Sequence, residues 1–186
     1  MSPQELIACL EDNPVIAAIG DDKWQDALAS PVQVLFYLSS NLLTVKERIC
    51  QAHEADKLAM VHIDLAEGIG KDNSGIQYLT NCGADGIIST KANMIRLAKN
   101  HGLIAIQRFF ALDSKGMESI DEMIKNSSPH LIEIMPGVVE KAIRRYSTGK
   151  IPVIAGGLIE TKAEVTGILR CGALAASTGK KELWHV

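Results

Sequence analysis

Eight short, almost continuously apolar segments recur along the chain, and they constrain the fold more than any other feature of the sequence. Continuous apolar runs indicate strands that are buried on both faces, as in parallel sheets covered by helices. Such strands need long crossover connections, so the segments between them should contain helices. The predicted strands are Val15–Ile19, Val32–Tyr37, Leu58–Ile63, Gly86–Ser89, Ile104–Gln107, Leu131–Met135, Val153–Ala155 and Ala173–Ser177.

Stretches with helical spacing lie between most of these segments. Eight strands alternating with helices favour an α/β fold, a TIM-like (β/α) barrel. We expect a short or irregular barrel with some helices reduced, because 186 residues fall below the usual range of about 200 to 400 and the Ile19–Pro31 connection holds little more than one helical turn. An open doubly wound sheet satisfies the same pattern and remains an alternative. The predicted helices are Trp24–Leu28, Leu42–Ala55, Asn93–Lys99, Ser119–Lys125, Val138–Tyr146 and Lys162–Arg170.

Length and composition fit one barrel-like domain that spans residues 1–186. A hydrophobic share of 47% and a charged share of 22% are typical of globular proteins. The N-terminal residues lack the features of a secretory signal, and no apolar run is long enough to span a bilayer, so we expect a cytoplasmic protein without a membrane partner. A net charge of −3 and an aromatic share of 4% argue against nucleic-acid binding over the whole surface. RNA contact would have to be local or depend on assembly into a homo-oligomer.

Two loops that contain glycine or hydroxyl residues follow the last two predicted strands. Gly156 and Gly157 follow the seventh strand, and Ser177 and Thr178 open the loop after the eighth. Barrels of this type commonly hold phosphate at these two positions. Glycine lets backbone N–H groups approach an anion, and a following helix N-terminus adds a favourable partial charge. We therefore predict phosphate binding by these four residues; alternatively, the glycines only shape a tight turn.

Two cations and one carboxylate interrupt or end other predicted strands. Lys91 and Arg108 follow the fourth and fifth strands, where each could neutralise a phosphate. Lys91 could instead form a Schiff base if it were desolvated, or both could be solvated surface charges. Glu133 lies within an apolar run, where an unpaired carboxylate is costly, so we expect it to pair with Lys91 or Arg108.

Three further ionisable residues cluster around the end of the third predicted strand. His62 and Asp64 are two apart and should face the same side of that strand, with Glu67 just beyond it. With Glu133 they could contact polyol hydroxyls, bind a divalent cation or form an acid–base set. The alternative is a hydrogen-bonded histidine and a helix-capping acid. The sequence leaves a metal requirement open.

A basic stretch lies on the predicted Val138–Tyr146 helix. Lys141, Arg144 and Arg145 belong to it, and Lys141 and Arg145 share one helical face because they are four residues apart. A solvated face is the usual interpretation of such a stretch. The alternative is a local contact with an RNA backbone.

Eight motifs follow one another along the chain: Pro14–Ala18, Val61–Gly68, Asp85–Lys91, Ile106–Arg108, Leu112–Ser114, Ile132–Gly137, Ile154–Ile159 and Leu183–Trp184. Taken in order and with their spacing, they resemble the glycerol uptake operon antiterminator family of glycerol-3-phosphate-responsive regulators. The resemblance covers nearly the whole chain. It implies a barrel-like protein, not an enzyme, that needs no obligatory cofactor and takes glycerol-3-phosphate as its effector. The loaded protein would act on leader mRNA so that transcription passes a terminator into glycerol-utilisation genes.

Two other functions remain open at this point. The same rim of lysine, histidine and carboxylates would suit an aldolase, isomerase or phosphodiesterase that acts on a small phosphate ester, and the fold does not decide between an enzyme and a regulator. A regulator that acts mainly through protein contacts is the other.

Gly179 stands where the family commonly has serine, which could remove one hydroxyl contact and leave the backbone donors intact.

Overall fold

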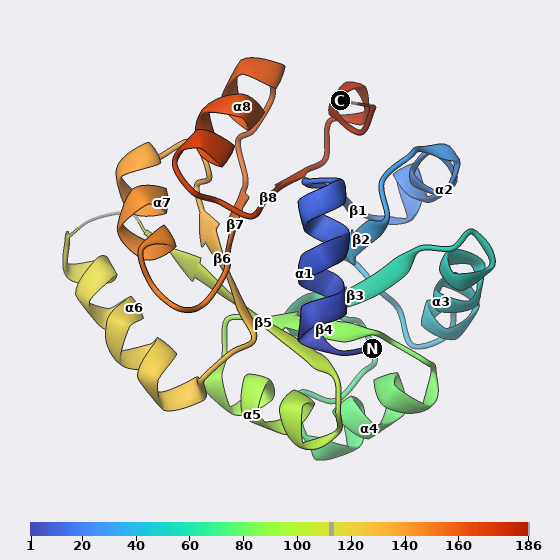
Figure 1. Ribbon diagram of the computed structural model, residues 1–186. Helices are drawn as coiled ribbons and strands as arrows, with labels where there is room; N and C mark the ends of the chain where they lie inside the picture. The colour runs from blue at the N-terminus through green and yellow to red at the C-terminus, as the bar shows by residue number, and fades with distance from the viewer. Residues whose placement is uncertain (112–113, 186) are drawn as a thin grey trace.

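The computed structural model describes residues 1–111 and 114–185, and its eight strands close into one parallel barrel with neighbours in sequence order (Figure 1). β1 pairs with both β2 and β8, which closes the sheet. The predicted TIM-like α/β barrel is confirmed, and the open doubly wound sheet is wrong. Leu112 and Asp113, which belong to one of the family motifs, lie outside the described residues. The strands are β1 (Val15–Ile19), β2 (Val34–Tyr37), β3 (Leu58–His62), β4 (Gly86–Ser89), β5 (Ile104–Phe110), β6 (Leu131–Met135), β7 (Val153–Gly156) and β8 (Ala175–Thr178).

Helices surround the barrel, and some are reduced as predicted. The helix that follows β1 has six residues, and only a 3₁₀ turn, η3 (Lys181–Leu183), follows β8. Thr161 caps the last helix, and the helix predicted to begin at Ser119 begins at Ser114. The helices are α1 (Pro3–Asp12), α2 (Trp24–Ala29), α3 (Val45–Glu54), α4 (Asn73–Asn81), α5 (Ala92–Asn100), α6 (Ser114–Ser127), α7 (Glu140–Ser147) and α8 (Lys162–Arg170).

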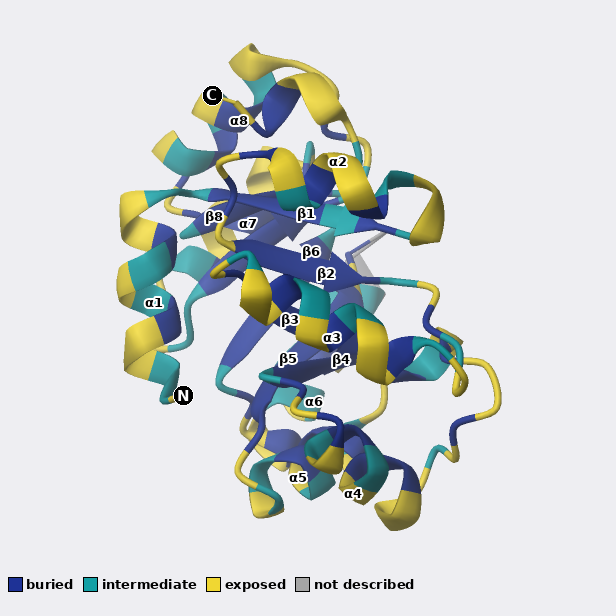
Figure 2. Ribbon diagram, turned by 90° about the vertical axis from the view of Figure 1, so that its right-hand side faces the viewer, coloured by how far each residue is buried: buried dark blue, intermediate teal, exposed yellow. Residues whose placement is uncertain are grey.

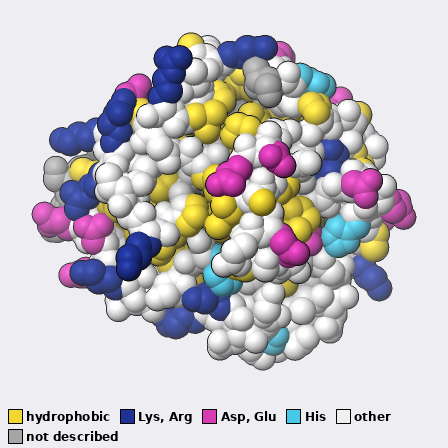
Figure 3. Space-filling view, in the orientation of Figure 1, with side chains coloured by type: hydrophobic (Ala, Val, Ile, Leu, Met, Phe, Trp, Pro, Cys, Tyr) yellow, Lys and Arg dark blue, Asp and Glu magenta, His cyan; other side chains and the backbone are white. Residues whose placement is uncertain are grey.

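α1 closes the N-terminal end of the barrel, a role that the sequence did not predict. A capping box between Ser2 and Glu5 starts this helix. Leu6 and Leu10 are fully buried and belong to the same cluster as the residues that fill the barrel. In Figure 3, which views the molecule from this side, acidic side chains gather over α1 at the centre of the face. The candidate ligand residues therefore lie at the opposite, C-terminal end of the strands.

Two separate apolar clusters hold the fold together. One fills the space between the strands and the outer helices, so the helices bury one face and expose the other (Figure 2). The other fills the barrel interior. Because side chains alternate along a strand, Met60 inside the barrel places His62 inside as well, and Ile106 likewise places Arg108. Polar side chains thus replace apolar ones in the last layer of the interior.

Candidate functional site

A cavity of about 390 Å³ opens at the C-terminal end of the barrel, between the loops that follow β7 and β8. It brings together residues at or beyond the C-terminal ends of strands β1, β2, β5, β6, β7 and β8. The predicted site residues that line it are Arg108, Glu133, Gly157, Ser177 and Thr178.

A buried ion pair forms one wall of this cavity. The Arg108 Nε atom donates to Glu133 Oε2 at 2.5 Å, and both residues are buried. Ser177 Oγ donates to the other carboxylate oxygen, Glu133 Oε1, at 2.6 Å. Of the two partners predicted for Glu133, Arg108 is the one that the structure places beside it. The three residues form a fixed polar network, because each oxygen of the buried carboxylate accepts a hydrogen bond.

Gly156 makes room for this network. A Cβ atom at this position would lie 2.3 Å from Glu133 Oε1 and 2.6 Å from Ser177 Oγ. Any larger residue would therefore collide with the Ser177–Glu133 hydrogen bond. The carbonyl of Gly156 also accepts a hydrogen bond from the Gly137 N–H group at 2.6 Å. The structure thus gives Gly156 a packing role beneath the cavity, and its predicted contact with phosphate stays a prediction.

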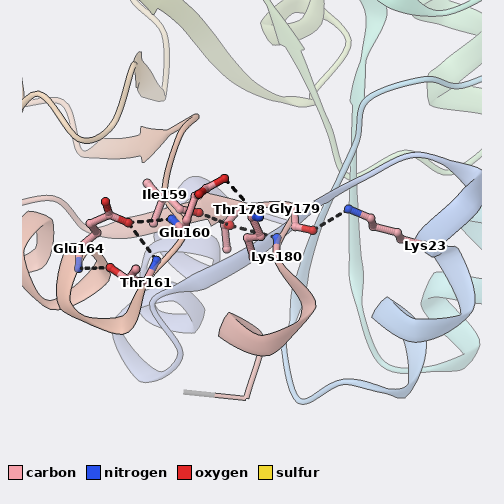
Figure 4. A network of polar contacts seen from close by, with 8 residues as sticks. All are labelled: Lys23, Ile159, Glu160, Thr161, Glu164, Thr178, Gly179 and Lys180. Atoms are coloured by element: carbon pink, nitrogen blue, oxygen red, sulfur yellow. Dashed lines mark hydrogen bonds and ion pairs between the residues drawn. The ribbon is translucent and has the colours of Figure 1, made fainter.

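The β7 and β8 loops are tied together at the cavity mouth (Figure 4). Thr178 Oγ1 donates to the Ile159 carbonyl at 2.8 Å and accepts from the Lys180 N–H group at 3.1 Å. The Ser177 and Thr178 hydroxyl protons are therefore both engaged within the protein. Among the described residues, the backbone N–H groups of Gly157 and Gly179 donate no hydrogen bond. These amides, rather than the hydroxyl groups, are the available anion donors of the two loops.

The N-terminus of α8 is already occupied by a carboxylate of its own first turn. Glu164 Oε2 accepts from the backbone N–H groups of Glu160 and Thr161 at 2.8 and 2.9 Å, and Thr161 Oγ1 accepts from Glu164 N. The backbone hydrogen bond from Glu160, together with side-chain and backbone hydrogen bonds from Thr161, lowers the pKa of the exposed Glu164 carboxyl group. This capping reduces the number of backbone amides at this helix end that remain free for the expected contact with phosphate.

Two lysines that the sequence analysis did not single out line the cavity. Lys180 Nζ lies 3.2 Å from Glu160 Oε1, and Lys23 Nζ donates to the Gly179 carbonyl at 2.8 Å (Figure 4). Lys180 could have been found, because it directly follows the Ser177–Gly179 loop. Lys23 comes from η1 (Asp21–Lys23). No local sequence pattern predicts its contact with the Gly179 loop, because the two residues are more than 150 positions apart.

Lys91 and Asp64 lie outside the cavity. Lys91 is exposed at the start of α5. Asp64 accepts hydrogen bonds from Ser89 Oγ, Thr90 N and Thr90 Oγ1 at 2.6 to 2.8 Å. Burial opposes the ionisation of Asp64, but these hydrogen bonds outweigh it and hold the pKa of the carboxyl group below its usual value. Asp64 therefore fixes the β4–α5 loop that carries Lys91.

His62 points into the barrel without a hydrogen-bond partner. Its two ring nitrogens are buried and unpaired among the described residues, and the side chain is 3% exposed. Burial lowers the pKa of the imidazole to about 4, with help from the Arg108 charge and against the opposing effect of Asp64. The expectation that His62 and Asp64 share one strand face is wrong, because β3 ends at His62 and Asp64 lies in η2 (Ile63–Leu65).

Glu67, the remaining predicted residue of this group, is exposed. It accepts a hydrogen bond from Asn41 Nδ2 at 3.2 Å. Within the described residues, no group of three or more His, Cys, Asp or Glu side chains is arranged to hold a metal ion. Nor do the helices described include one long and apolar enough to cross a membrane.

Comparison with known proteins identifies the family. The model of the family described as glycerol-3-phosphate responsive antiterminator matches residues 15–184. The chain belongs to this family. It is 37% identical over 183 residues to the uncharacterized protein YgcP of Escherichia coli (strain K12), a match that covers 96% of this chain and 95% of that protein.

Solved structures of related proteins agree with this assignment. The glycerol uptake operon antiterminator regulatory protein of Listeria monocytogenes is similar with a TM-score of 0.88 and 34% identity, over 93% of this chain and 95% of that one. A glycerol uptake operon antiterminator-related protein of Thermotoga maritima gives 0.83 and 35%, over 91% and 96%. Aldolases and an epimerase at 11–13% identity share the barrel fold alone.

The basic residues predicted to contact RNA lie on α7 of this antiterminator. Lys141, Arg144 and Arg145 are all exposed. Arg144 pairs with Glu140 at 3.3 Å, and Arg145 pairs with Asp121 of α6 at 2.7 Å. Exposed pairs of this kind are weak, so they leave the arginines able to exchange partners.

The end of the antiterminator barrel that carries the cavity also exposes apolar side chains. Apart from Met1, the exposed large hydrophobic residues of the described chain follow or end strands at the C-terminal rim. Clustered exposed apolar residues commonly mark contact surfaces. They are Leu42, Leu43, Leu65, Phe110, Val139 and Leu158.

Proposed function

We propose that this antiterminator binds glycerol-3-phosphate in the cavity between the β7 and β8 loops, and that the bound effector favours a state that engages leader mRNA. One observation carries the proposal. Two lysines and two unpaired backbone amides meet at one end of a cavity whose other wall is the Arg108–Glu133 network. The cavity thus offers anion donors at its mouth and hydroxyl partners deeper in.

The charge of the cavity suits a phosphate monoester. Three cations line it, Lys23, Arg108 and Lys180, against two carboxylates, Glu133 and Glu160. Lys180 and Glu160 are both largely exposed, so their ion pair is weak. A phosphate oxygen can replace the Glu160 carboxylate as the partner of Lys180, and Lys23 supplies the second positive charge.

The glycerol end of the effector would lie toward the buried network. Each oxygen of Glu133 already accepts one hydrogen bond, and each has a second lone pair to accept a hydroxyl proton. Gly156 lets the carboxylate keep this position, because a Cβ atom there would lie 2.3 Å from Glu133 Oε1. The network is held in place without ligand, which limits the entropy lost on binding.

The geometry gives less support to an aldolase-type enzyme. A Schiff-base lysine must be desolvated to act as a nucleophile, and Lys91 is exposed. Lys57 is buried, but its Nζ atom donates to the carbonyl groups of Ser30 and Val32 at the N-terminal end of the barrel. Turnover of small phosphate esters by the purified protein would favour the enzyme.

Titration calorimetry with matched lysine variants tests effector binding. Lys180 lines the cavity, whereas its neighbour Lys181 pairs with Asp26 outside it. Lys180→Ala should weaken glycerol-3-phosphate binding at least about tenfold, as expected for a lost charge-assisted hydrogen bond. Lys181→Ala should bind like the wild type. Equal affinities for all three proteins would contradict the proposed cavity.

RNA binding is proposed for the basic face of α7. A groove of about 380 Å³ runs beside it between α6 and α7, and Lys125, Arg145 and Lys150 line it together with apolar residues. Cations over such a groove fit a nucleic-acid backbone, which binds mainly through phosphate contacts. The acidic face over α1, at the N-terminal end of the barrel, does not.

Leader-RNA binding in the presence and absence of glycerol-3-phosphate tests this part. We expect salt-sensitive binding that the effector strengthens, and by linkage the RNA should raise effector affinity by the same factor. Arg144→Glu combined with Arg145→Glu should weaken RNA binding without changing effector affinity. Arg96→Glu, at an exposed position of α5, is the control and should leave RNA binding unchanged. RNA affinity that survives the α7 reversal would remove this face from the RNA surface and favour action through protein contacts.

A further inference from the structure

Among the residues that the structure describes, His62 is the one buried titratable side chain in the barrel interior that the proposed cavity does not use. Both of its ring nitrogens lack a hydrogen-bond partner among the described residues. Buried polar atoms are nearly always paired, because an unpaired one loses its hydration without compensation. A histidine held in this way points to a partner outside the chain.

The register of the barrel places His62 beside the cavity. β2 and β3 pair Tyr37 with Val61, so the next residue of β2, Leu38, lies next to His62. Leu38 lines the cavity, as does Arg108, whose charge reaches the imidazole. In an eight-stranded barrel β3 stands opposite β7. A molecule anchored at the β7 loop therefore extends across the barrel toward His62.

The protonation state of His62 fits a hydroxyl group better than a phosphate. With a pKa of about 4, the imidazole is neutral near pH 7. A neutral imidazole has one N–H donor and one acceptor nitrogen, and a hydroxyl group can satisfy either. A phosphate dianion would favour a cationic partner, and the cavity places its lysines at the opposite end.

We propose that His62 contacts a hydroxyl group of the glycerol moiety and makes the site selective for hydroxyl-bearing phosphate esters. This inference rests on the proposed function and assigns the specificity of that site to one residue. Sites that hydrogen-bond a ligand hydroxyl reject analogues without it, because their buried polar groups are then left unpaired.

Calorimetric titrations with three ligands test the role of His62. The ligands are glycerol-3-phosphate, 3-hydroxypropyl phosphate, which lacks the central hydroxyl group, and inorganic phosphate. His62→Leu should weaken glycerol-3-phosphate binding about tenfold, equivalent to the loss of about 1.4 kcal/mol, and leave inorganic phosphate unchanged. It should also reduce the preference for glycerol-3-phosphate over 3-hydroxypropyl phosphate. Met60→Leu, two residues deeper on the same strand, controls for altered packing and should keep the wild-type affinities.

The outcomes separate this inference from the proposed function. A wild type that binds no glycerol-3-phosphate overturns both. A wild type that binds it, with a His62→Leu variant that binds it equally well or loses phosphate in parallel, overturns the role of His62 alone. Imidazole ¹⁵N resonances of the wild type give a second readout that needs no variant. They should shift with glycerol-3-phosphate and not with inorganic phosphate, and identical spectra with both would contradict the contact.

Discussion

The pH dependence of stability should depend strongly on His62. The folded protein holds this imidazole at a pKa of about 4, because it is buried beside Arg108. An unfolded histidine titrates near pH 6.5. Between these values, the unfolded chain binds a proton that the folded protein does not bind. The free energy of unfolding contributed by this group is therefore complete above pH 6.5, falls as the pH is lowered, and levels off below about pH 4.

The size of the effect follows from the two pKa values. The separation between 6.5 and about 4 corresponds to a total of about 3 kcal/mol, of which about 2 kcal/mol is lost by pH 5. His62→Leu removes this term and keeps a side chain of similar volume. Because the variant also removes two unpaired buried nitrogens, its stability at pH 7.5 should equal or exceed that of the wild type.

Urea unfolding followed by tryptophan fluorescence measures this difference, since Trp24 and Trp184 are both buried. The advantage of His62→Leu over the wild type should grow by about 2 kcal/mol between pH 7.5 and pH 5. Titrating groups that do not interact with His62 act in both proteins and cancel. Met60→Leu should keep the wild-type pH dependence. If the difference in unfolding free energy between the two proteins stayed constant from pH 7.5 to pH 5, the conclusion that burial lowers the pKa of His62 would be refuted.

Three further substitutions test individual packing arguments by the same unfolding assay. Gly156→Ala places a methyl group 2.3 Å from Glu133 Oε1 and should cost about 1–3 kcal/mol; an unchanged midpoint would mean that the carboxylate moves freely. Leu10→Ala opens a hole where α1 plugs the barrel and should cost about 2–5 kcal/mol. Thr161→Ala removes the cap shared with Glu164 and should cost about 1 kcal/mol while leaving effector affinity unchanged.

The barrel could be predicted from the sequence because burial on both faces leaves a direct signal in each strand. The pairing of Glu133 followed from the cost of an isolated buried carboxylate, and Arg108 satisfies it. For Asp64, the prediction from strand alternation was wrong. β3 stops one residue earlier than predicted, and a 3₁₀ turn carries the carboxylate to Ser89 and Thr90 instead of into the barrel.

The parts that could not be predicted depend on contacts between distant segments. The sequence of α1 contains a capping box, formed by Ser2 and Glu5. Its position could not be predicted, because Leu6 and Leu10 cover an apolar surface that exists only at the N-terminal end of the closed barrel. Lys23 reaches Gly179 across the gap between β1 and β8, a proximity that follows from closure and not from spacing. The missing partner of His62 is likewise visible only once every neighbouring side chain has been placed.

A crystal structure of the protein with bound glycerol-3-phosphate tests the central claim most directly. We expect the phosphate group at the mouth of the cavity, within hydrogen-bond distance of the Gly157 and Gly179 amides and the Lys180 ammonium group. The glycerol hydroxyl groups should face Glu133 and His62. Phosphate bound beside exposed Lys91, outside the cavity between the β7 and β8 loops, would contradict it.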